Sequence, residues 1–291
     1  MRILSIQSSV AYGHAGNSSA VFPLQRLGHE VWPVSTVQFS NHTGYGAWRG
    51  PVLEPADVAD VITGIEERGV FGGCDAVLSG YQGAETVGEV ILNAVARVRA
   101  ANPAAVYCCD PVMGDVGRGF FVRPGIPEFM RDRVVPQADL VTPNQFELEF
   151  LTGRPEGSVR TLGDLLGAVD ALRKMGPRTV LVTSVHTDST DPQGVSMLAA
   201  DDEGTWLVTT PLLPISVNGA GDATAALFLA HHHSASLING EGSRTALERT
   251  AATIYGILKL TADTGHQEIR LVQAQDEIAS PSREVAAERL R

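Results

Sequence analysis

Short apolar runs alternate with longer amphipathic segments along most of this 291-residue chain, and this alternation constrains the fold most strongly. Apolar runs bounded by turn residues predict buried strands, and the longer segments between them predict helices. Beyond residue 209 the chain is expected to be mostly helical as far as residue 279. The expected strands are residues 2–7, 30–37, 75–78, 105–109, 139–141, 179–182, 195–200 and 205–209, and the expected helices before them or between them are residues 17–27, 55–68, 84–100 and 161–175.

Strands separated by helices are typical of right-handed crossovers, which build a largely parallel sheet with helices on both faces. Residues 195–200 and 205–209 differ, because the turn Asp201-Asp202-Glu203-Gly204 between them predicts an antiparallel pair. No Ser/Gly-rich linker, repeat or low-complexity block interrupts the chain. We therefore expect one α/β domain over residues 1–291, with the charged last dozen residues loosely ordered.

Composition narrows the classes of partner. The net charge is −11 and the sequence pI is about 5.1, so the surface repels a phosphate backbone and nucleic acid is not expected. The N-terminal residues lack the features of a signal peptide, and no stretch approaches the roughly 18 apolar residues that span a bilayer. We expect a cytoplasmic protein without membrane contact. Its three cysteines lack metal-ligand spacing and are expected to be buried free thiols: Cys74, Cys108 and Cys109.

Polar residues follow five of the expected strands at the point where each strand ends. Parallel sheets bind ligands outside the carboxyl ends of their strands. Any one of these residues would be explained as a turn or helix cap, but five groups at one edge favour a polar cleft. The five groups are Gln7-Ser8, Ser79-Gly80-Tyr81, Asp110-Pro111, Thr142-Pro143-Asn144 and Thr183-Ser184.

The sharpest local motif is Asn218-Gly219-Ala220-Gly221-Asp222, followed by an apolar run at residues 223–230. Glycines let several N–H groups turn toward one point, and a helix N-terminus adds partial positive charge, so the motif predicts an anion site. Asp222 would then be a base that accepts a proton from an attacking hydroxyl, or only a favourable first-turn acid. The motif is not a Walker A loop, because no Lys-Ser/Thr follows it.

Two further carboxylates point to the same edge of the sheet. Asp110 ends an expected strand, and Glu147 lies one helical turn after Asn144. Two separated carboxylates near an anion site suit Mg²⁺ held between water and nucleotide phosphates. For Glu147 the alternative is a capping box with Asn144 as the N-cap, and the local sequence slightly favours that structural role.

Eight short segments that carry a family resemblance occur in the same order along nearly the whole chain. They are residues 5–8, 12–18, 37–45, 78–81, 110–114, 142–144 with Glu147, 219–222 and 273–276. Together these segments resemble pyridoxal kinases of the ribokinase superfamily. Residues 219–222 mark the superfamily only, whereas residues 38–45 are far more specific for pyridoxal kinases.

The resemblance implies a ribokinase-like fold and ATP-dependent phosphorylation of the 5′-hydroxyl of pyridoxal. Asp222 would accept the hydroxyl proton, and the backbone of Gly219, Ala220 and Gly221 would surround the transferring phosphoryl group. Mg²⁺ would be bound, through water, at the ATP phosphates by Asp110 and Glu147. Other residues on the nucleotide side would be Thr142, Asn144, Thr183, Ser184, Thr210, Pro211, Leu212 and Leu213.

The resemblance also implies a pyridine pocket, with Ser8 hydrogen-bonding the ring and Tyr81 packing on it. Residues 114–121 would be a mobile flap over the site, as their glycines also indicate. A homodimer is implied, and a requirement for a monovalent cation such as K⁺ is left open. The residues implied around the pyridine ring are Ser8, His42, Thr43, Gly44, Tyr81 and Asp222.

Two departures from the family concern ATP. Thr183 stands where bacterial relatives often carry lysine, so a phosphate contact is missing or is supplied by Ser184 instead. The segment between Pro211 and Asn218 is also a few residues shorter than in those relatives, which leaves the adenine contacts open.

Other functions remain as alternatives. One is a hydroxymethylpyrimidine kinase of the same superfamily, against which residues 38–45 and Tyr81 argue. Another is a pyridoxal-binding protein without catalysis, against which Asp222 and Glu147 argue. An enzyme that uses pyridoxal phosphate as cofactor needs a pocket lysine, and the only two lysines, Lys174 and Lys259, lie in helix-like segments.

The run of three histidines at residues 231–233 is not expected to bind metal, because consecutive helical residues point in different directions.

Overall fold

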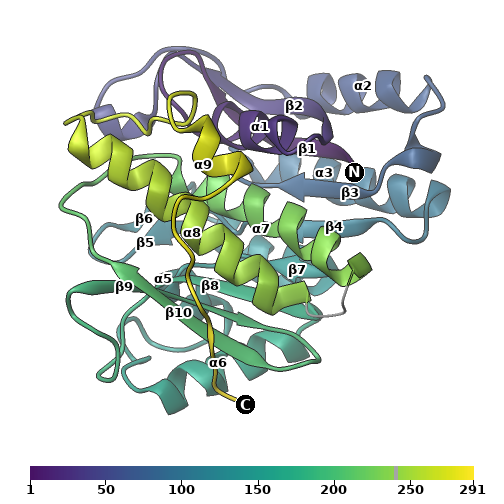
Figure 1. The fold of residues 1–291 in the computed structure, drawn as a ribbon. Coiled ribbons are helices and arrows are strands. Elements are labelled where there is room, and N and C mark those ends of the chain that lie inside the picture. The colour runs from purple at the N-terminus through teal and green to yellow at the C-terminus, as the bar shows by residue number, and fades with distance from the viewer. Residues whose placement is uncertain (239–241) are drawn as a thin grey trace.

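A computed structural model describes residues 1–238 and 242–291. A single mixed sheet runs through the described part of the chain in the order β11-β10-β9-β8-β7-β4-β3-β1-β2 (Figure 1). Every neighbouring pair from β2 to β8 is parallel, and the pairs from β8 to β11 are antiparallel. The strands are β1 (Arg2–Val10), β2 (Glu30–Phe39), β3 (Ala76–Ser79), β4 (Val106–Cys109), β7 (Leu140–Val141), β8 (Thr179–Val185), β9 (Gly194–Ala200), β10 (Thr205–Pro211) and β11 (Glu288–Arg289).

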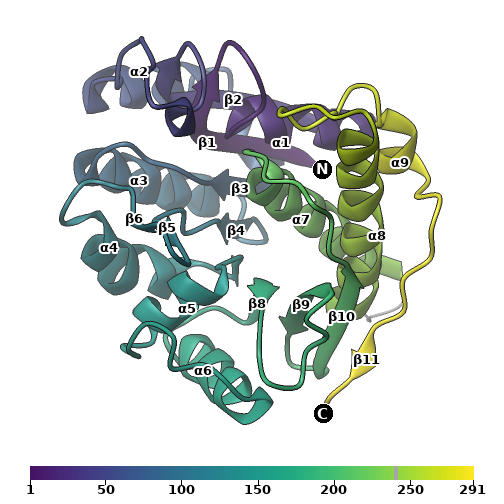
Figure 2. The same cartoon turned by 90° about the vertical axis from the view of Figure 1, so that its left-hand side faces the viewer.

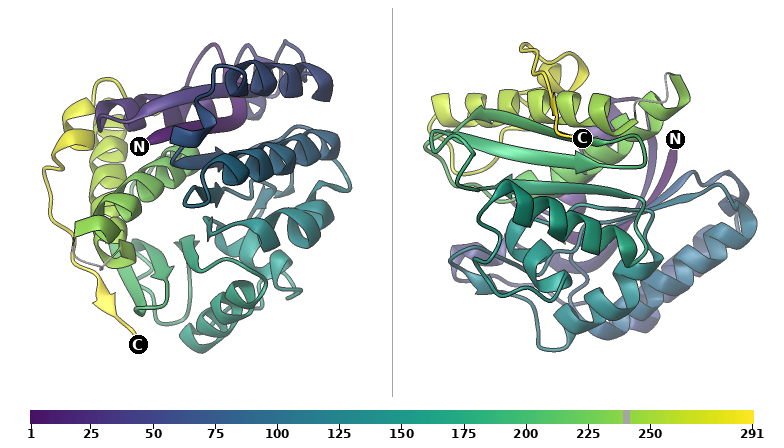
Figure 3. Two further views of the ribbon diagram at one scale, coloured as in Figure 1. Left: turned by 90° about the vertical axis from the view of Figure 1, so that its right-hand side faces the viewer. Right: turned by 90° about the horizontal axis from the view of Figure 1, so that it is seen from below.

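Helices cover both faces of this sheet (Figure 2). Strand residues alternate between two apolar layers: Leu4 and Ile6 of β1 face the layer that includes α2, α3, α5 and α6, whereas Ile3 faces α1, α7 and α8. Figure 3 shows the C-terminal helices, in yellow and green, on the opposite side of the molecule from α3 and α6. The helices are α1 (Asn17–Arg26), α2 (Pro55–Glu66), α3 (Glu85–Ala101), α4 (Ile126–Phe129), α5 (Gln145–Leu151), α6 (Leu162–Lys174), α7 (Ala220–Ile238), α8 (Gly242–Asp263) and α9 (Gln275–Ala279).

The prediction of a largely parallel α/β sheet with helices on both faces is confirmed. The antiparallel pair at the chain's acidic turn is also confirmed, since Thr205 of β10 pairs with Ala200 of β9. The cysteines are buried and unpaired, as expected. No helix in residues 1–238 or 242–291 combines the length and apolarity that crossing a bilayer requires.

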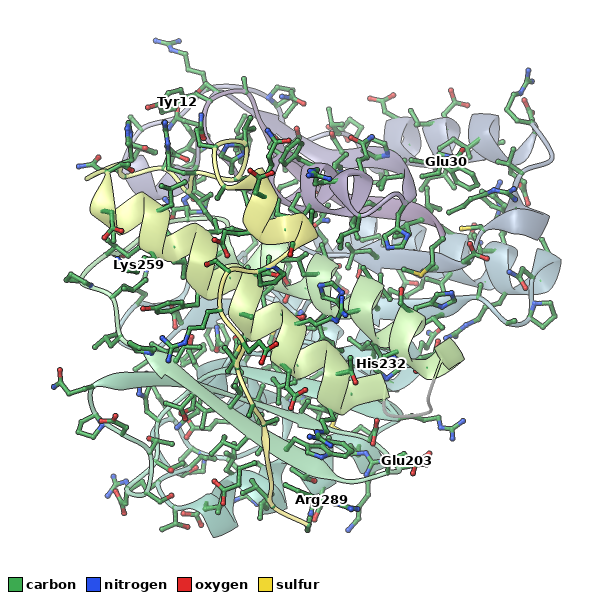
Figure 4. The ribbon with its side chains drawn as sticks, viewed as in Figure 1. Tyr12, Glu30, Glu203, His232, Lys259 and Arg289 are labelled. Carbon is green, nitrogen blue, oxygen red and sulfur yellow. The ribbon has the colours of Figure 1, made fainter. Side chains whose placement is uncertain are left out.

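The prediction of a loosely ordered C-terminus was wrong. The tail crosses the molecule from α9 to the sheet edge, where β11 pairs antiparallel with β10 (Figure 1). The N–H of Leu290 donates to the carbonyl of Thr205 at 2.8 Å, and Arg291 forms an ion pair with Asp170 of α6. Arg289 lies beside the β9–β10 turn and donates to the carbonyl of Glu203 at 2.8 Å (Figure 4). Charge patterning alone missed these contacts because their partners lie far away in the sequence.

The expected flap is partly ordered as a hairpin. β5 (Gly114–Asp115) pairs antiparallel with β6 (Gly119–Phe120). The ring of Phe120 packs edge-on against Phe146 and Phe150, with centroids 5.0 Å apart in each case. These contacts anchor the base of the hairpin on α5 and leave its tip, residues 116–118, exposed.

Candidate active site

The carboxyl ends of the parallel strands meet at a cavity of about 190 Å³, between the β5–β6 hairpin and the start of α7. It brings together residues that are up to 180 positions apart, because parallel strands all end at this edge. Among the predicted site residues, those that line it are His42, Thr43, Asp110, Thr142, Asn144, Glu147, Thr183, Gly219, Ala220, Gly221 and Asp222.

A second cavity of about 350 Å³ adjoins the first and shares Thr183, Ala220 and Gly221 with it. Its walls come from β8, β9 and β10 on one side and from α7 and α8 on the other. The predicted nucleotide residues Ser184, Thr210, Pro211, Leu212 and Leu213 all line this cavity. Apolar side chains of α8 complete it, and sequence reasoning missed them because helix α8 reads only as a packing helix: Ala251, Ile254, Tyr255 and Leu258.

A third, more open hollow of about 470 Å³ lies beside the loop at residues 42–45. Gly44 lines it, together with Tyr45, Arg118 and Asn218. Ser8 and Tyr81 do not line any of these three cavities. Ser8 is buried beside Gly16, and Tyr81 packs against Val10, Val37 and Phe39. Their roles around the pyridine ring therefore stay predictions.

The glycine turn before α7 is shaped by its contact with the β1–α1 loop. Gly219 has a φ of 84°, and a Cβ there would lie 2.0 Å from the carbonyl oxygen of His14. The hydroxyl of Ser19 donates to the carbonyl of Gly219 at 2.7 Å. Only glycine fits this position, because the backbone is left-handed there and a Cβ atom would collide with the carbonyl of His14.

Asp222 lies in the first turn of α7 and lines the small cavity. Burial raises the pKa of its carboxyl, and hydrogen bonds from the backbone N–H groups of Gly16 and Asp222 itself oppose this rise. A carboxylate with a raised pKa is a stronger proton acceptor than a solvent-exposed one. Its position at the helix N-terminus and its basicity therefore agree with the predicted base.

Asp110 follows β4 and is only 7% exposed. The hydroxyl of Thr142, at the end of β7, donates to its carboxylate at 2.8 Å. Burial, followed by the nearby charge of Asp222, raises the pKa of Asp110 to about 8 against this hydrogen bond. The two carboxylates therefore repel one another across the cavity, which creates an environment that favours a bound cation.

Glu147 has the capping role that its local sequence favours. Its carboxylate accepts the N–H of Asn144 at 2.9 Å, while the Asn144 side chain accepts the N–H of Glu147. The other carboxylate oxygen accepts the N–H of Met113 at 2.9 Å, at the base of the hairpin. Burial and then Asp110 raise the pKa of Glu147 to about 8. The residue therefore joins α5 to the hairpin and also lines the small cavity.

Strand β8 distorts where it reaches the larger of the first two cavities. Its register with β9 shifts between Val182 and Val185. Within this irregularity Ser184 has a φ of 52°, a left-handed conformation found at no other non-glycine residue in the described part of the chain. Strained backbone of this kind is concentrated at functional sites. The distortion puts Thr183 and Ser184 in the cavity wall. Thr183 is the position at which the sequence departs from the lysine of bacterial relatives.

Sequence reasoning also missed two charged residues around the site. Arg118, at the hairpin tip, lines both the small cavity and the open hollow. Glu268, after α8, accepts the N–H of His14 and the hydroxyl of Tyr45. The glycine-rich hairpin was a usable signal for Arg118, but nothing local marks Glu268, because its partners are more than 200 residues away.

The three histidines of α7 are not brought together as metal ligands. No group of three His, Cys, Asp or Glu residues able to hold a metal ion occurs in residues 1–238 and 242–291. His231 and His232 are held neutral, since burial lowers the pKa of each. Lys259, one of the two lysines, pairs with Asp263 on the outer side of α8 (Figure 4).

Comparison with known proteins decides the family. A protein family described as phosphomethylpyrimidine kinase matches residues 75–271. The curated protein "Pyridoxal kinase PdxY" of Rubrobacter xylanophilus is 62% identical over 282 residues, which cover 97% of this chain and 94% of that protein. A protein of the same name from Leifsonia xyli subsp. xyli is 58% identical over 290 residues and all of both chains. The chain belongs to the pyridoxal kinase family.

Solved structures of the pyridoxal kinase family agree with the fold. The pyridoxal kinase of Leishmania donovani, in complex with ADP and pyridoxine, superimposes with a TM-score of 0.90 at 27% identity, covering 100% of this chain and 99% of that one. A putative phosphomethylpyrimidine kinase of Bacteroides thetaiotaomicron, at 24% identity and a TM-score of 0.87, shares the fold. The predicted resemblance to pyridoxal kinases, the ribokinase-like fold and the assignment as a kinase are confirmed.

Proposed function

We propose that this chain transfers the γ-phosphoryl group of ATP to the 5′-hydroxyl of pyridoxal, giving pyridoxal 5′-phosphate and ADP. The observation that carries the proposal is the small cavity, whose lining includes Asp222, the glycine turn, Asp110 and Glu147. A base, an anion site and carboxylates that attract a cation are the parts that phosphoryl transfer requires. The choice of pyridoxal as the substrate rests on the full-length relatives that are named pyridoxal kinase.

Each cavity suits one part of the substrates. The larger cavity has apolar side chains from α8 and β9 in its walls, which suit an adenine ring, and it shares Gly221 with the small cavity. The phosphates would then lie at the N-terminus of α7, where N–H groups favour negative charge. Pyridoxal would enter beside His42, Thr43 and Gly44, with its hydroxymethyl group directed toward Asp222.

The reaction is a single displacement at phosphorus. Asp222 accepts the proton of the 5′-hydroxyl as this oxygen forms a bond to the γ-phosphorus. The bond from that phosphorus to the β–γ bridging oxygen breaks, and ADP leaves with the electron pair. N–H groups of Gly219, Ala220 and Gly221 stabilise the negative charge of the transferring group.

The residues present fit Mg²⁺ at the phosphates. Asp110 supplies a buried carboxyl group whose pKa is raised by burial and then by the nearby charge of Asp222, and Mg²⁺ prefers oxygen ligands. Both oxygens of Glu147 already accept backbone N–H groups, so this residue would act through a water molecule. Mg²⁺ would supply positive charge at the phosphate oxygens.

Four further properties belong to the proposal and rest on the family. They are a single kinase domain over residues 1–291, a homodimer, a cytoplasmic location and the use of a monovalent cation such as K⁺. Size-exclusion chromatography with light scattering tests the dimer, and replacement of K⁺ by a large organic cation in the assay tests the ion.

A substrate panel tests the function against its alternatives. ADP release would be measured with pyridoxal, pyridoxine, pyridoxamine and hydroxymethylpyrimidine, with an assay lacking acceptor as the control. We expect the highest kcat/KM with pyridoxal. A higher value with hydroxymethylpyrimidine would support the phosphomethylpyrimidine kinase description of the matching family. Tight binding of pyridoxal without ADP release would instead indicate a vitamer-binding protein.

A further inference from the structure

The phosphate cleft contains several carboxylates and very little positive charge. Asp110, Glu147 and Asp222 all line the small cavity, and Asp115 lines both this cavity and the nucleotide cavity. Across the described residues that line the three neighbouring cavities, Arg118 is the one arginine or lysine. ATP adds further negative charge, so a protein cation would stabilise the transferring group in addition to Mg²⁺ and the backbone N–H groups.

Arg118 is held at the cleft by the architecture of the hairpin. Asn144 donates to the carbonyl of Gly114 at 2.8 Å, and Glu147 accepts the N–H of Met113, so the base of the hairpin is fixed to α5. At the tip, the N–H of Arg118 donates to the carbonyl of Asp115 at 3.1 Å. The guanidinium lies 5.5 Å from the centroid of the Phe121 ring, a cation–π contact that limits its conformations.

The guanidinium also remains available for a ligand. Arg118 is exposed, and within residues 1–238 and 242–291 its side chain takes part in no ion pair with a carboxylate. The charge of Arg118 also acts on the loop at residues 42–45, since the pKa of His42 is lowered by burial and then by Arg118. The N–H groups of its guanidinium are therefore available to bind a ligand where Arg118 lines both the small cavity and the open hollow.

We propose that Arg118 is a catalytic residue that binds the γ-phosphoryl group during its transfer from ATP to pyridoxal. This inference rests on the proposed function. In bacterial relatives a lysine often stands at the position of Thr183, on β8. Arg118 would supply the positive charge in its place, from the hairpin side of the cleft. Guanidinium groups bind phosphate through two parallel hydrogen bonds, and an arginine that contacts the transferring group stabilises its transition-state charge.

The test combines kinetics with binding. Arg118→Gln and Arg118→Lys would be compared with wild type by ADP release under saturating pyridoxal and Mg·ATP. Calorimetry would give the Kd of each protein for ADP and for a non-hydrolysable ATP analogue with an imido bridge between the β and γ phosphates. The matched control is Arg68→Gln, which removes an exposed arginine in the turn after α2, away from all three cavities.

We expect Arg118→Gln to lower kcat by roughly 10- to 1,000-fold and Arg118→Lys to lower it less, since lysine keeps the charge but not the paired hydrogen bonds. The ATP analogue should bind about tenfold more weakly to Arg118→Gln, because a charge-assisted hydrogen bond to the γ-phosphate is lost, while ADP binding and the Arg68→Gln control stay unchanged.

Two results would overturn the role of Arg118. One is a kcat of Arg118→Gln within about threefold of wild type. The other is an equal loss of affinity for ADP and the analogue, which would indicate a general charge effect. If wild type does not phosphorylate pyridoxal, the proposed function fails, and the difference between the two nucleotide affinities still tests the γ-phosphate contact.

Discussion

The backbone N–H of His14 donates a 3.1 Å hydrogen bond to the carboxylate of Glu268, a residue 254 positions further along the chain. The same carboxylate accepts the hydroxyl of Tyr45, and this contact raises the pKa of Tyr45 to about 12. The carbonyl of His14 lies directly against Gly219. Glu268 therefore joins the loop at residues 42–45 to the β1–α1 loop, and through His14 to the glycine turn.

We predict that Glu268→Gln raises KM for pyridoxal by about tenfold, because the loop at residues 42–45 loses a charge-assisted hydrogen bond. KM for ATP should change little, since neither Glu268 nor Tyr45 lines the larger cavity, where ATP is proposed to bind. Steady-state kinetics with each substrate varied measures the split. Tyr45→Phe should act in the same way, and the double variant should be no worse than Glu268→Gln alone.

Glu277→Gln is the matched control for Glu268. Its carboxylate also accepts a backbone N–H, that of Ser282, but in the segment around α9 that contributes no residue to the three cavities. An equal rise in both KM values, or the same effect in the control, would reduce Glu268 to a general contribution to stability.

Asp222→Asn separates catalysis from helix stabilisation. Asparagine keeps the shape of the side chain but is unable to accept the proton, so kcat should fall by roughly 10²–10⁴-fold with little change in ATP affinity. If Asp222 only stabilises the helix dipole, the loss is about 0.3–1 kcal/mol of stability with nearly full activity. Kinetics and a thermal melt on one purified variant distinguish the two. Activity within about threefold of wild type contradicts the proposed base.

Glu147→Gln should affect both stability and the metal. An amide is unable to accept hydrogen bonds with both of its terminal atoms, so one backbone N–H loses its partner at a cost of about 1–3 kcal/mol. Loss of the charge should also raise the Mg²⁺ concentration needed for half-maximal activity, measured by Mg²⁺ titration at fixed ATP.

Glu149→Gln is the matched control for the Glu147 experiment. Glu149 is buried and accepts the N–H groups of Gly157 and Val159, but it does not line any of the three cavities. We expect it to lose comparable stability with an unchanged Mg²⁺ titration. Identical titrations for both variants would leave Glu147 with its capping role alone.

The buried carboxyl of Asp110 predicts how stability depends on pH. Its pKa is raised from an ordinary 3.8 to about 8, so between these values the native state holds a proton that the unfolded chain has released. Stability of the ligand-free protein should therefore fall as pH rises from about 4 to 8. Asp110→Asn removes this titration, and at pH 8 its Tm should exceed that of wild type by roughly 2 °C or more while activity is lost. A lower Tm at pH 8 would show that Asp110 is stabilising as a carboxylate.

The same shift predicts proton release on ligand binding. Mg·ATP should bind the charged form of Asp110, so binding near pH 7 should release protons to the buffer. Calorimetry in two buffers with different ionisation enthalpies measures the number released. Asp110→Asn should release fewer.

Local patterns in the sequence determined the strands, most helices and the edge of the sheet that carries the site. Burial between two helical layers requires the apolar runs, and strand ends require polar turns, so both features are visible residue by residue. Asp110, Glu147 and the motif at residues 218–222 were recognisable for this reason. The capping box of Glu147 was recognisable because all of its contacts lie within four residues.

Contacts between distant segments were decided only by the tertiary structure. The C-terminal residues look loose as a charged segment, yet β10 offers them an unpaired strand edge, and Asp170 offers Arg291 a partner. Glu268 reaches His14 only because α8 and α1 pack on the same face of the sheet, and Arg118 reaches the cleft only because Phe120 packs on α5. Composition and spacing describe what a segment favours by itself, whereas these pairings depend on which surfaces the folded sheet places side by side.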